Sequence, residues 1–441
     1  MTIVNSPKMA SSSRRIYSIT VLTIVAVLIL FITASLADIT EIKKLVPGDG
    51  AYADYFGSSV SISGEYAIVG APSADTGAQN AGAAYIFEHS GSTWSEVEPR
   101  LVPSEIAMNE GFGSSVSIAG DSAIVGKPFA GAAYVFRRTG GTWTQEQKLT
   151  ASDHVVSDYF GTSVSIAADY AIVGAPYNDD NGSMSGSAYI FERSGSTWTQ
   201  VAKLTASDGE AGDRFGISVS ISGNYAIVGA PFDDNLAGTD AGSVYFYRRV
   251  EGIWEDEQKL VDPSGDDGDA YGWAVDIYGK TAIIGAYGHN DDSGDDVGSA
   301  VIAKYWNDTW LPSDYLMASD RAPSDSFGYS VSISATYVII GAFNGDGVVD
   351  DSGAAYVFVQ TSGDDTTPLS VWEQMAKLIA SDGAGYDRFG GSVSISGPDA
   401  LVGAKWDNNS AGSAYIFDIL GQPSPSSSGV MPGIPLLLLD E

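Results

Sequence analysis

The residues of this sequence that could do chemistry are carboxylates at regular spacing. Some of the acids form doublets, and we predict that these doublets lie on a ligand-binding face: Asp179-Asp180, Asp233-Asp234 and Asp291-Asp292. Pairs of acids five residues apart recur along the chain: Asp49/Asp54, Glu105/Glu110, Asp153/Asp158, Asp208/Asp213, Asp320/Asp325 and Asp382/Asp387. Clustered carboxylates near backbone carbonyls supply the oxygen ligands that Ca²⁺ prefers.

Two interpretations of the acid pairs are open. In the structural one, the first acid caps a turn and the second holds the start of the next strand. The Ser264/Asp269 pair fits this interpretation, because Ser and Asp interchange in turns. In the functional one, the acids bind cations, with Asp346, Asp350 and Asp351 as the best single group of metal ligands. The sequence requires no cofactor, and Ca²⁺ is the ion that this group would take.

Catalytic constellations are not found in the sequence. It contains no Cys, and its three histidines, His89, His154 and His289, lie far apart along the chain. No G-x-S-x-G, H-E-x-x-H or P-loop motif is present. We therefore predict a protein that is not an enzyme, with His154 and His289 in solvated loops. The alternative is a hydrolase or lyase that works in a central channel.

The carboxylates are positioned by a repeat. An aromatic residue followed by Gly recurs at intervals of 48 to 62 residues. A period of about 50 residues indicates a solenoid, a propeller or an array. The pairs are Phe56-Gly57, Phe112-Gly113, Phe160-Gly161, Phe215-Gly216, Tyr271-Gly272, Phe327-Gly328 and Phe389-Gly390.

Each copy of the repeat contains four short runs typical of strands, here named A to D. In the fourth copy they are residues 217–221, 225–228, 243–247 and 254–260. Gly, Asn, Asp and Ser turns bound the runs, and none has the length or period of an amphipathic helix. Four antiparallel strands per copy form one blade, so the sequence predicts an all-β, seven-bladed β-propeller over residues 38–420.

The two ends of the repeat array predict how the ring closes. The seventh copy has no run D, whereas residues 39–45 precede the first copy and end in Lys-Leu like other D runs. We expect this N-terminal strand to complete the last blade and to hide two sheet edges. The Trp residues of the D runs are expected to pack between blades. One extra residue between Trp94 and Leu101 predicts a bulge.

The aromatic-Gly pair that begins each copy and the Gly-Ala-Pro that ends run B resemble the FG-GAP repeat. Gly-Ala-Pro is present at residues 70–72, 174–176 and 229–231, and it varies in the other copies. The resemblance covers nearly the whole chain and implies the seven-bladed propeller of integrin α subunits. The A–B connections are short turns such as Ser222-Gly223-Asn224, so the calcium loops of that family are not expected here.

The charge is concentrated on one end of the expected propeller. The formal charge is −33, and 31 of the 55 acids lie in the B–C and D–A connections, which share one face. Such a field repels nucleic acid and anionic membranes. The resemblance to integrins implies that a partner meets this face. Alternatively, the acids only keep the protein soluble.

Both ends of the chain differ from the repeat. Lys8, Arg14 and Arg15 precede an apolar run over residues 16–33, and the small residues Ser35 and Ala37 follow it. This pattern predicts a secretory signal over residues 1–37. An uncleaved signal anchor is the alternative, and it would be the only contact with a membrane. Residues 421–441 form a tail that begins rich in Pro and Ser.

These observations predict a secreted or cell-surface binding or adhesion module. Its acidic face would meet an extracellular protein or glycan, with or without cations, and we expect a monomer. The alternative is a purely structural surface protein. Three sequons predict glycosylation at Asn181, Asn307 and Asn408 in a eukaryotic secretory pathway.

Overall fold

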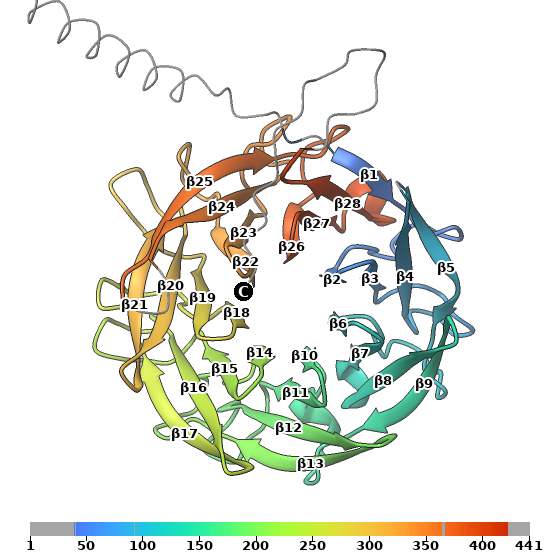
Figure 1. Cartoon of the computed structure of the whole chain (residues 1–441), viewed down its shortest axis with the longest axis horizontal. Coiled ribbons are helices and arrows are strands. Elements are labelled where there is room, and N and C mark those ends of the chain that lie inside the picture. The colour runs from blue at the N-terminus through green and yellow to red at the C-terminus, as the bar shows by residue number, and fades with distance from the viewer. Residues whose placement is uncertain (1–38, 40, 92, 364–366, 422–441) are drawn as a thin grey trace, which may run out of the picture.

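The computed structural model describes residues 39, 41–91, 93–363 and 367–421. These residues form seven antiparallel sheets of four strands each, arranged as blades around a central axis (Figure 1). The predicted all-β, seven-bladed propeller is confirmed. The predicted signal segment, residues 1–37, lies outside the described residues, as does all of the predicted tail except residue 421.

Each blade is a meander whose strands run outward from the axis in the order A to D. The A strands are β2 (Ser59–Ser63), β6 (Val116–Ala119), β10 (Ser163–Ala167), β14 (Ser218–Ser222), β18 (Ala274–Tyr278), β22 (Phe327–Ser334) and β26 (Phe389–Ser396). The B strands are β3 (Tyr66–Ala71), β7 (Ser122–Lys127), β11 (Tyr170–Ala175), β15 (Tyr225–Ala230), β19 (Thr281–Ala286), β23 (Tyr337–Ala342) and β27 (Asp399–Ala404).

In the first five blades the outer two strands are longer than the inner two. The C strands are β4 (Ala83–Ser90), β8 (Ala132–Thr139), β12 (Ser187–Ser194), β16 (Ser243–Val250), β20 (Ser299–Trp306), β24 (Ala354–Ser362) and β28 (Ser413–Asp418). The D strands are β5 (Thr93–Leu101), β9 (Thr142–Leu149), β13 (Thr197–Leu204), β17 (Ile253–Leu260), β21 (Thr309–Leu316), β25 (Val371–Leu378) and β1 (Glu41–Leu45). Three short helical turns lie in the loops, namely η1 (Pro128–Ala130), η2 (Val156–Asp158) and α2 (Asp407–Ser410).

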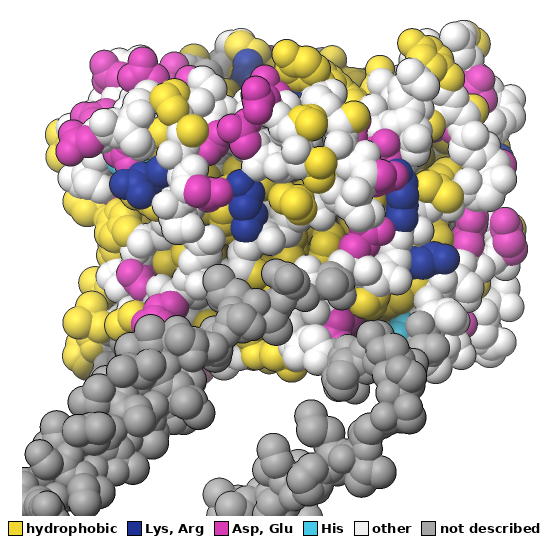
Figure 2. Space-filling model, turned by 90° about the horizontal axis from the view of Figure 1, so that it is seen from above, with side chains coloured by type: hydrophobic (Ala, Val, Ile, Leu, Met, Phe, Trp, Pro, Cys, Tyr) yellow, Lys and Arg dark blue, Asp and Glu magenta, His cyan; other side chains and the backbone are white. Residues whose placement is uncertain are grey.

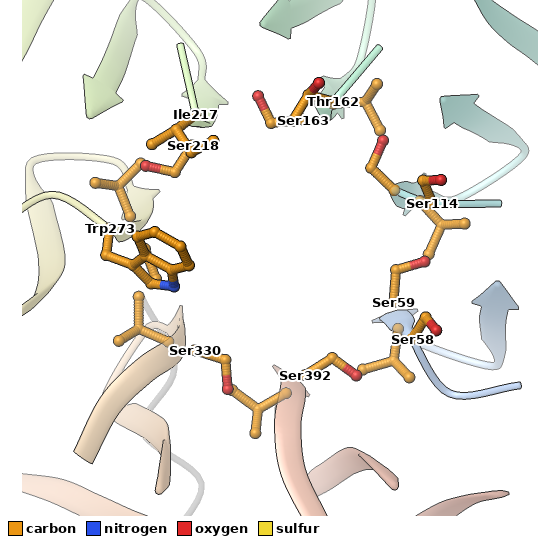
Figure 3. Close-up of a pocket in the computed structure, with 18 of the residues that line it drawn as sticks. Ser58, Ser59, Ser114, Thr162, Ser163, Ile217, Ser218, Trp273, Ser330 and Ser392 are labelled. Atoms are coloured by element: carbon orange, nitrogen blue, oxygen red, sulfur yellow. The ribbon is translucent and has the colours of Figure 1, made fainter. Parts of the chain in front are cut away.

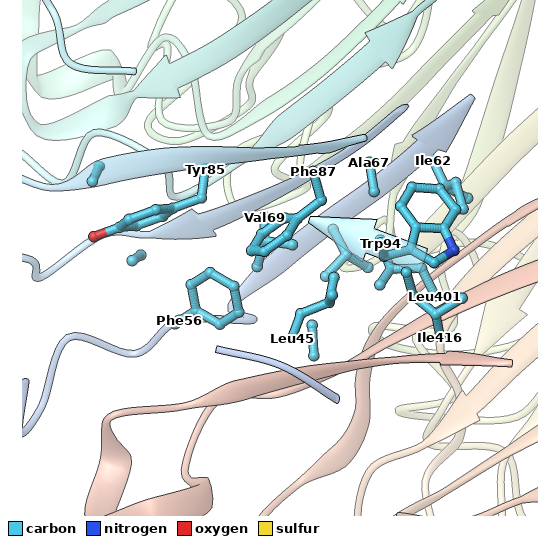
Figure 4. Packing of buried hydrophobic residues seen from close by; sticks show 14 of the residues in the cluster. Leu45, Phe56, Ile62, Ala67, Val69, Tyr85, Phe87, Trp94, Leu401 and Ile416 are labelled. Atoms are coloured by element: carbon cyan, nitrogen blue, oxygen red, sulfur yellow. The ribbon is translucent and has the colours of Figure 1, made fainter. Parts of the chain in front are cut away.

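Residues from adjacent blades form the hydrophobic core. In one cluster Phe56 and Trp94 of the first blade join Leu401 and Ile416 of the last (Figure 4). Phe56 meets Tyr85 edge to face, with ring centroids 5.5 Å apart. The predicted place of the D-strand Trp residues between blades is therefore confirmed, and burial of these rings supplies the main force that holds blade to blade.

The N-terminal strand closes the ring, as predicted. Strand β1 pairs antiparallel with β28, with Leu45 opposite Ala414 and Lys44 opposite Tyr415. The predicted bulge in β5 is also present, as a register shift opposite Ala84 and Ile86. A shift of one residue occurs in the C–D pairs of the other blades too, so β5 adds its extra residue to a bulge that the repeat already has.

The glycines of the repeat allow neighbouring blades to touch through their backbones. A Cβ added to Gly229, in Gly-Ala-Pro, would lie 1.9 Å from the carbonyl oxygen of Gly272, in the aromatic-Gly pair of the next blade. Gly272 itself has a φ of 94°, which L side chains rarely adopt. The two glycines are therefore one contact, made once between each pair of blades.

Serines of the A strands form a second link between blades. The Ser218 hydroxyl donates to the Gly272 carbonyl over 2.7 Å, and the Ser165 hydroxyl accepts the Ile221 N–H over 3.3 Å. The structure shows that these hydroxyls also satisfy polar groups on the inner strand edge, which would otherwise face the channel unpaired.

Candidate ligand-binding face

The B–C and D–A loops lie at one end of the propeller, because the four strands of each blade alternate in direction. This end is called the loop face below. Seen from the side, acidic side chains lie beside Lys and Arg side chains and do not form one unbroken surface (Figure 2). On the loop face itself, five lysines lie within 2.7 Å of a carboxylate, so this face is less simply acidic than its sequence indicates.

The first acid contacts a lysine in five of the six pairs, and in the remaining pair Asp49 contacts Arg100. In the fourth blade, Lys259 donates to Asp208 over 2.7 Å and Tyr245 donates to the same carboxylate over 2.8 Å. Lys259 also reaches Asp233 at 2.9 Å. Burial opposes ionisation of Asp208, but the hydrogen bonds from Lys259 and Tyr245 hold its pKa below the ordinary value. The same Lys–acid pair recurs as Lys44–Asp382, Lys148–Glu105, Lys203–Asp153 and Lys377–Asp320.

The second acid of the pair caps the turn that the first was expected to cap. The Asp213 carboxylate is 4% exposed and accepts the Glu210 N–H over 2.7 Å. Burial and the nearby Asp233 raise the pKa of Asp213 to about 6. The same backbone bond is made by Asp54, Asp269, Asp325 and Asp387. The role of turn cap, which we expected for the first acid, therefore belongs to the second acid. The first acid instead pairs with a lysine.

The six acids of the doublets do not share one kind of position. Asp233 is buried against Lys259 and the Ser243 hydroxyl, whereas Asp180 is exposed and pairs with Lys203. Asp179 and Asp234 are exposed and accept loop N–H groups from Met184 and Asp240. Asp291 pairs with Arg321 at 2.6 Å, and the bonds from Ser293 and then Arg321 lower its pKa to about 2. Asp292 is exposed.

The predicted metal ligands lie in one B–C loop without converging. Asp346 accepts the Asp351 N–H over 3.2 Å, so it closes the loop as Asp179 and Asp234 close theirs. Asp351 has a φ of 57°, and Asp350 is exposed. Within the described part of the chain, no three acidic or His side chains are grouped so as to hold a metal ion.

The three predicted glycosylation sites are exposed, but they occupy different ends of the propeller. Asn181 and Asn408 lie in B–C loops, and the Asn408 amide donates to Asp407 over 3.1 Å. Asn307 lies in the C–D turn between β20 and β21, at the opposite end.

The fifth blade departs from the repeated cluster. Val301, Tyr315 and Ser264 stand where the other blades have Tyr, Lys and the first acid. His289, expected to be solvated, instead lies 3.2 Å from Asp269, and this hydrogen bond raises its pKa. His154 is exposed, as expected, and His89 stacks on Trp94. The three histidines remain in separate blades.

A channel of about 270 Å³ follows the axis and is lined by the A strands. Ser, Thr and Val residues form most of its wall, including Ser58, Ser114 and Ser392 (Figure 3). The Trp273 ring extends from the fifth blade into the opening. Tyr329 of the next blade also lines the channel. Both follow an aromatic-Gly pair directly, which places them where the D–A loops meet the axis.

Aromatic side chains continue from Trp273 around the channel mouth. Trp273 lies 4.8 Å from Tyr287 and 6.2 Å from Phe232 between ring centroids. Tyr329 lies 5.6 Å from Trp273 and 4.1 Å from Phe343. All five side chains are half-buried. They are called the aromatic arc below: Phe232, Trp273, Tyr287, Tyr329 and Phe343.

An arginine stands at each end of the aromatic arc. The Arg214 guanidinium lies 4.7 Å from the Phe232 ring, and that of Arg388 lies 4.9 Å from the Phe343 ring. Lys405 is next to Arg388, and burial, followed by the charge of Arg388, lowers its pKa. Among the described residues, none of these three cations has a carboxylate partner. The other Lys and Arg side chains of the loop face do: Lys44, Arg100, Lys127, Lys148, Lys203, Lys259, Arg321 and Lys377.

The sequence contained a signal for this arc that the acid pattern concealed. Aromatics follow Gly-Ala-Pro or its variants at equivalent positions, as in Phe129, Tyr177, Phe232 and Trp406. Arg214 and Arg388 precede their aromatic-Gly pairs directly. Both positions lie beside the glycines that define the repeat, where a loop residue needs no role in binding.

These features define a closed seven-bladed propeller with a cationic and aromatic mouth on one face, a fold consistent with a binding module. The chain belongs to the FG-GAP repeat family, whose repeat matches residues 39–87, 94–136, 143–191, 198–247, 254–302, 310–358 and 372–417. No curated protein matches the sequence.

Two solved structures are similar in outline. Sqt1 of Saccharomyces cerevisiae aligns with a TM-score of 0.47 and 10% identity, over 83% of this chain and 83% of that chain. A protein from Lactobacillus plantarum aligns with a TM-score of 0.47 and 13% identity, over 74% of this chain and 86% of that chain. Within the described ranges, no helix has the length and apolar character needed to cross a bilayer.

Proposed function

We propose that this protein is a secreted or cell-surface binding module that meets a protein or glycan partner with its loop face. The observation that carries the proposal is the mouth of the channel, where five rings and three cations without carboxylate partners lie together. Half-exposed aromatic and Arg side chains are the groups that dominate binding energy in protein interfaces. The resemblance to integrin α subunits supports an adhesive role.

The proposal assigns recognition and not catalysis to this face. The acid pairs that could have served as acid and base are held by lysines or by backbone N–H groups, as Asp208 and Asp213 illustrate. Ca²⁺ is left out of the proposal, because Lys259 lies between Asp208 and Asp233, where a cation would bind.

Binding measurements on glycan arrays and on immobilised extracellular proteins test the proposal. Once a partner is found, Trp273→Ala should reduce its affinity. Arg138→Gln, at the opposite end, should leave the affinity unchanged. If the affinity of the partner fell only with Arg138→Gln, the binding surface would lie at the end opposite the loop face, and the proposal that the loop face binds the partner would be refuted.

The extracellular location is tested separately. We expect cleavage after Ala37, so that the exported protein begins at Asp38. Mass spectrometry of the protein from the culture medium and from washed membranes distinguishes the outcomes. A full-length N-terminus in the membrane fraction would support the anchor instead, and full-length protein confined to the cytoplasm would refute export.

A further inference from the structure

We propose that the channel mouth binds an acidic oligosaccharide, a chain of sugar rings that carry carboxylates. This inference rests on the proposed function and specifies its ligand. The site comprises the aromatic arc with Arg214 at one end and Arg388 and Lys405 at the other. It is distinct from the acid pairs and from the predicted metal ligands.

The charge of the ligand follows from the three unpaired cations. On a protein of charge −33, the described Lys and Arg residues of the loop face are otherwise paired with carboxylates. Arg388 and Lys405 additionally repel each other, which contributes to the lowered pKa of Lys405. Neighbouring cations without acids are electrostatically costly unless an anion joins them. An arginine fork pairs with a carboxylate through two parallel hydrogen bonds.

The length of the ligand follows from the positions of the cations. Arg214 precedes the fourth blade and Arg388 precedes the seventh, and ring contacts connect them through Phe232, Trp273, Tyr329 and Phe343. A single small anion could reach only one end. A ligand with a carboxylate at each end and apolar faces between them would contact the whole arc.

A saccharide fits this surface better than a peptide because of the donors that remain. Backbone N–H groups on the inner strand edge already donate to serine hydroxyls, as Ile62 does to Ser394 and Ile221 to Ser165. Loop N–H groups are taken by caps such as Asp234. The free donors are side chains, namely the guanidinium groups, the Lys405 ammonium and the Trp273 indole N–H in the channel (Figure 3). Sugars offer many oxygen acceptors and apolar C–H faces that lie on aromatic rings, whereas an extended peptide that adds to a strand edge relies on main-chain bonds.

Calorimetry with defined oligosaccharides tests the inference. The probes are hexamers of galacturonate and of mannuronate, their methyl esters, which keep the rings and remove the charge, and a hexaglutamate peptide. We expect at least one acid hexamer to bind at least about tenfold more tightly than its ester, since a hydrogen bond to a charged group contributes about that factor.

Variants assign that binding to the channel mouth. Arg214→Gln and Arg388→Gln should each weaken binding about tenfold or more. Arg138→Gln is the matched control, because Arg138 also lies over a ring, 4.4 Å from Tyr66, but pairs with Asp121 at the other end of the propeller. It should leave binding unchanged, and thermal melting should show that all three variants fold.

Four results would overturn the inference. These are no binding by either acid hexamer at about 1 mM, equal binding of acid and ester, tighter binding of hexaglutamate, or equal losses with Arg138→Gln and Arg388→Gln. Equal binding of acid and ester that is lost with Trp273→Ala would overturn the charge argument alone and would leave the loop face as a glycan-binding surface. Loss of a partner only through the opposite face would instead overturn the proposed function.

Discussion

Single side chains of the loop face carry charges that the fold must balance. Asp213 is the plainest case, because its carboxylate is 4% exposed and lies near Asp233. Its turn needs a hydrogen-bond acceptor for the Glu210 N–H but does not need a charge. Asp213 can therefore accept this hydrogen bond whether or not its carboxyl group is ionised.

Asp213→Asn should stabilise the protein at neutral pH. The pKa of Asp213 is raised to about 6 in the folded protein, against about 3.9 in an unfolded chain. The folded state thus holds the proton more tightly, and the stability that this gives is complete below about pH 4 and lost as the pH rises through 6. Asparagine keeps the acceptor without the charge. We expect the free energy of unfolding at pH 7 to rise by about 1–3 kcal/mol.

Denaturant unfolding of Asp213→Asn and the parent at pH 4.5 and pH 7 provides the measurement. The difference between the two proteins should be larger at pH 7. A variant that is less stable than the parent at pH 7 would show that attraction between Asp213 and Lys259 exceeds the cost of burying the carboxylate.

Lys259→Met should destabilise the fourth blade. Lys259 bridges the exposed Asp208 and the buried Asp233, at 2.7 and 2.9 Å. Methionine would leave a buried carboxylate without its cation, a change that costs about 2 kcal/mol or more for a partly exposed pair. Chemical unfolding measures the loss, with Lys43→Met on the exposed side of β1 as control. The added substitution Asp233→Asn should recover part of it, and no recovery would mean that Lys259 acts through packing alone.

Blades are positioned by glycines that can have no side chain. Gly229→Ala places a Cβ 1.9 Å from the Gly272 carbonyl oxygen, which is backbone and cannot rotate away. We expect a loss of about 3 kcal/mol or more, because the fifth blade must move. Gly48→Ala is the control, since the nearest atom to its Cβ would be a carboxylate oxygen of Glu96 at 3.6 Å. Equal melting temperatures for the two variants would contradict the close contact between blades.

The repeat explains why the elements could be predicted and the site only in part. Seven copies average out local ambiguity, so strand order and ring closure follow from the positions of the aromatic-Gly pairs. The acid pairs were also predicted from the sequence, but the sequence did not indicate that Asp213 caps the turn while Asp208 pairs with Lys259. This arrangement depends on Lys259, which lies 46 residues further along the chain than Asp213 and meets the pair only after the blade has formed. The aromatic arc joins side chains of three blades, so their positions beside the repeat glycines do not by themselves show that the rings meet.

At the scale of the whole molecule, much of the charge on the loop face is internally compensated. In several blades, a lysine at the end of the D strand lies between an acid of a D–A loop and an acid of a B–C loop. Lys44 lies in this way between Asp382 and Asp407. The acidity thus contributes to holding the loops together as well as to solubility. The three cations that have no carboxylate partner among the described residues mark a region of this face where an anion would be attracted.

The ring as a whole depends on the N-terminal strand. Leu45 of β1 is 1% exposed and occupies the place that Leu149 occupies in β9 of the second blade, also 1% exposed. If β1 completes its blade as fully as a covalently continuous D strand does, Leu45→Ala and Leu149→Ala should destabilise the protein equally, by about 2–5 kcal/mol.

Thermal and denaturant unfolding compare the stability losses of the two variants. Deletion of residues 39–45 is a stronger test of the same strand. The deletion removes Leu45, the Lys44 ion pairs with Asp382 and Asp407, and the pairing along β28. It also exposes a strand edge, so we expect a large fall in the melting temperature together with association between chains. A Leu45→Ala variant that unfolds like the parent while Leu149→Ala does not would mean that β1 frays in solution and that the first and last blades hold the ring closed by their core contacts alone.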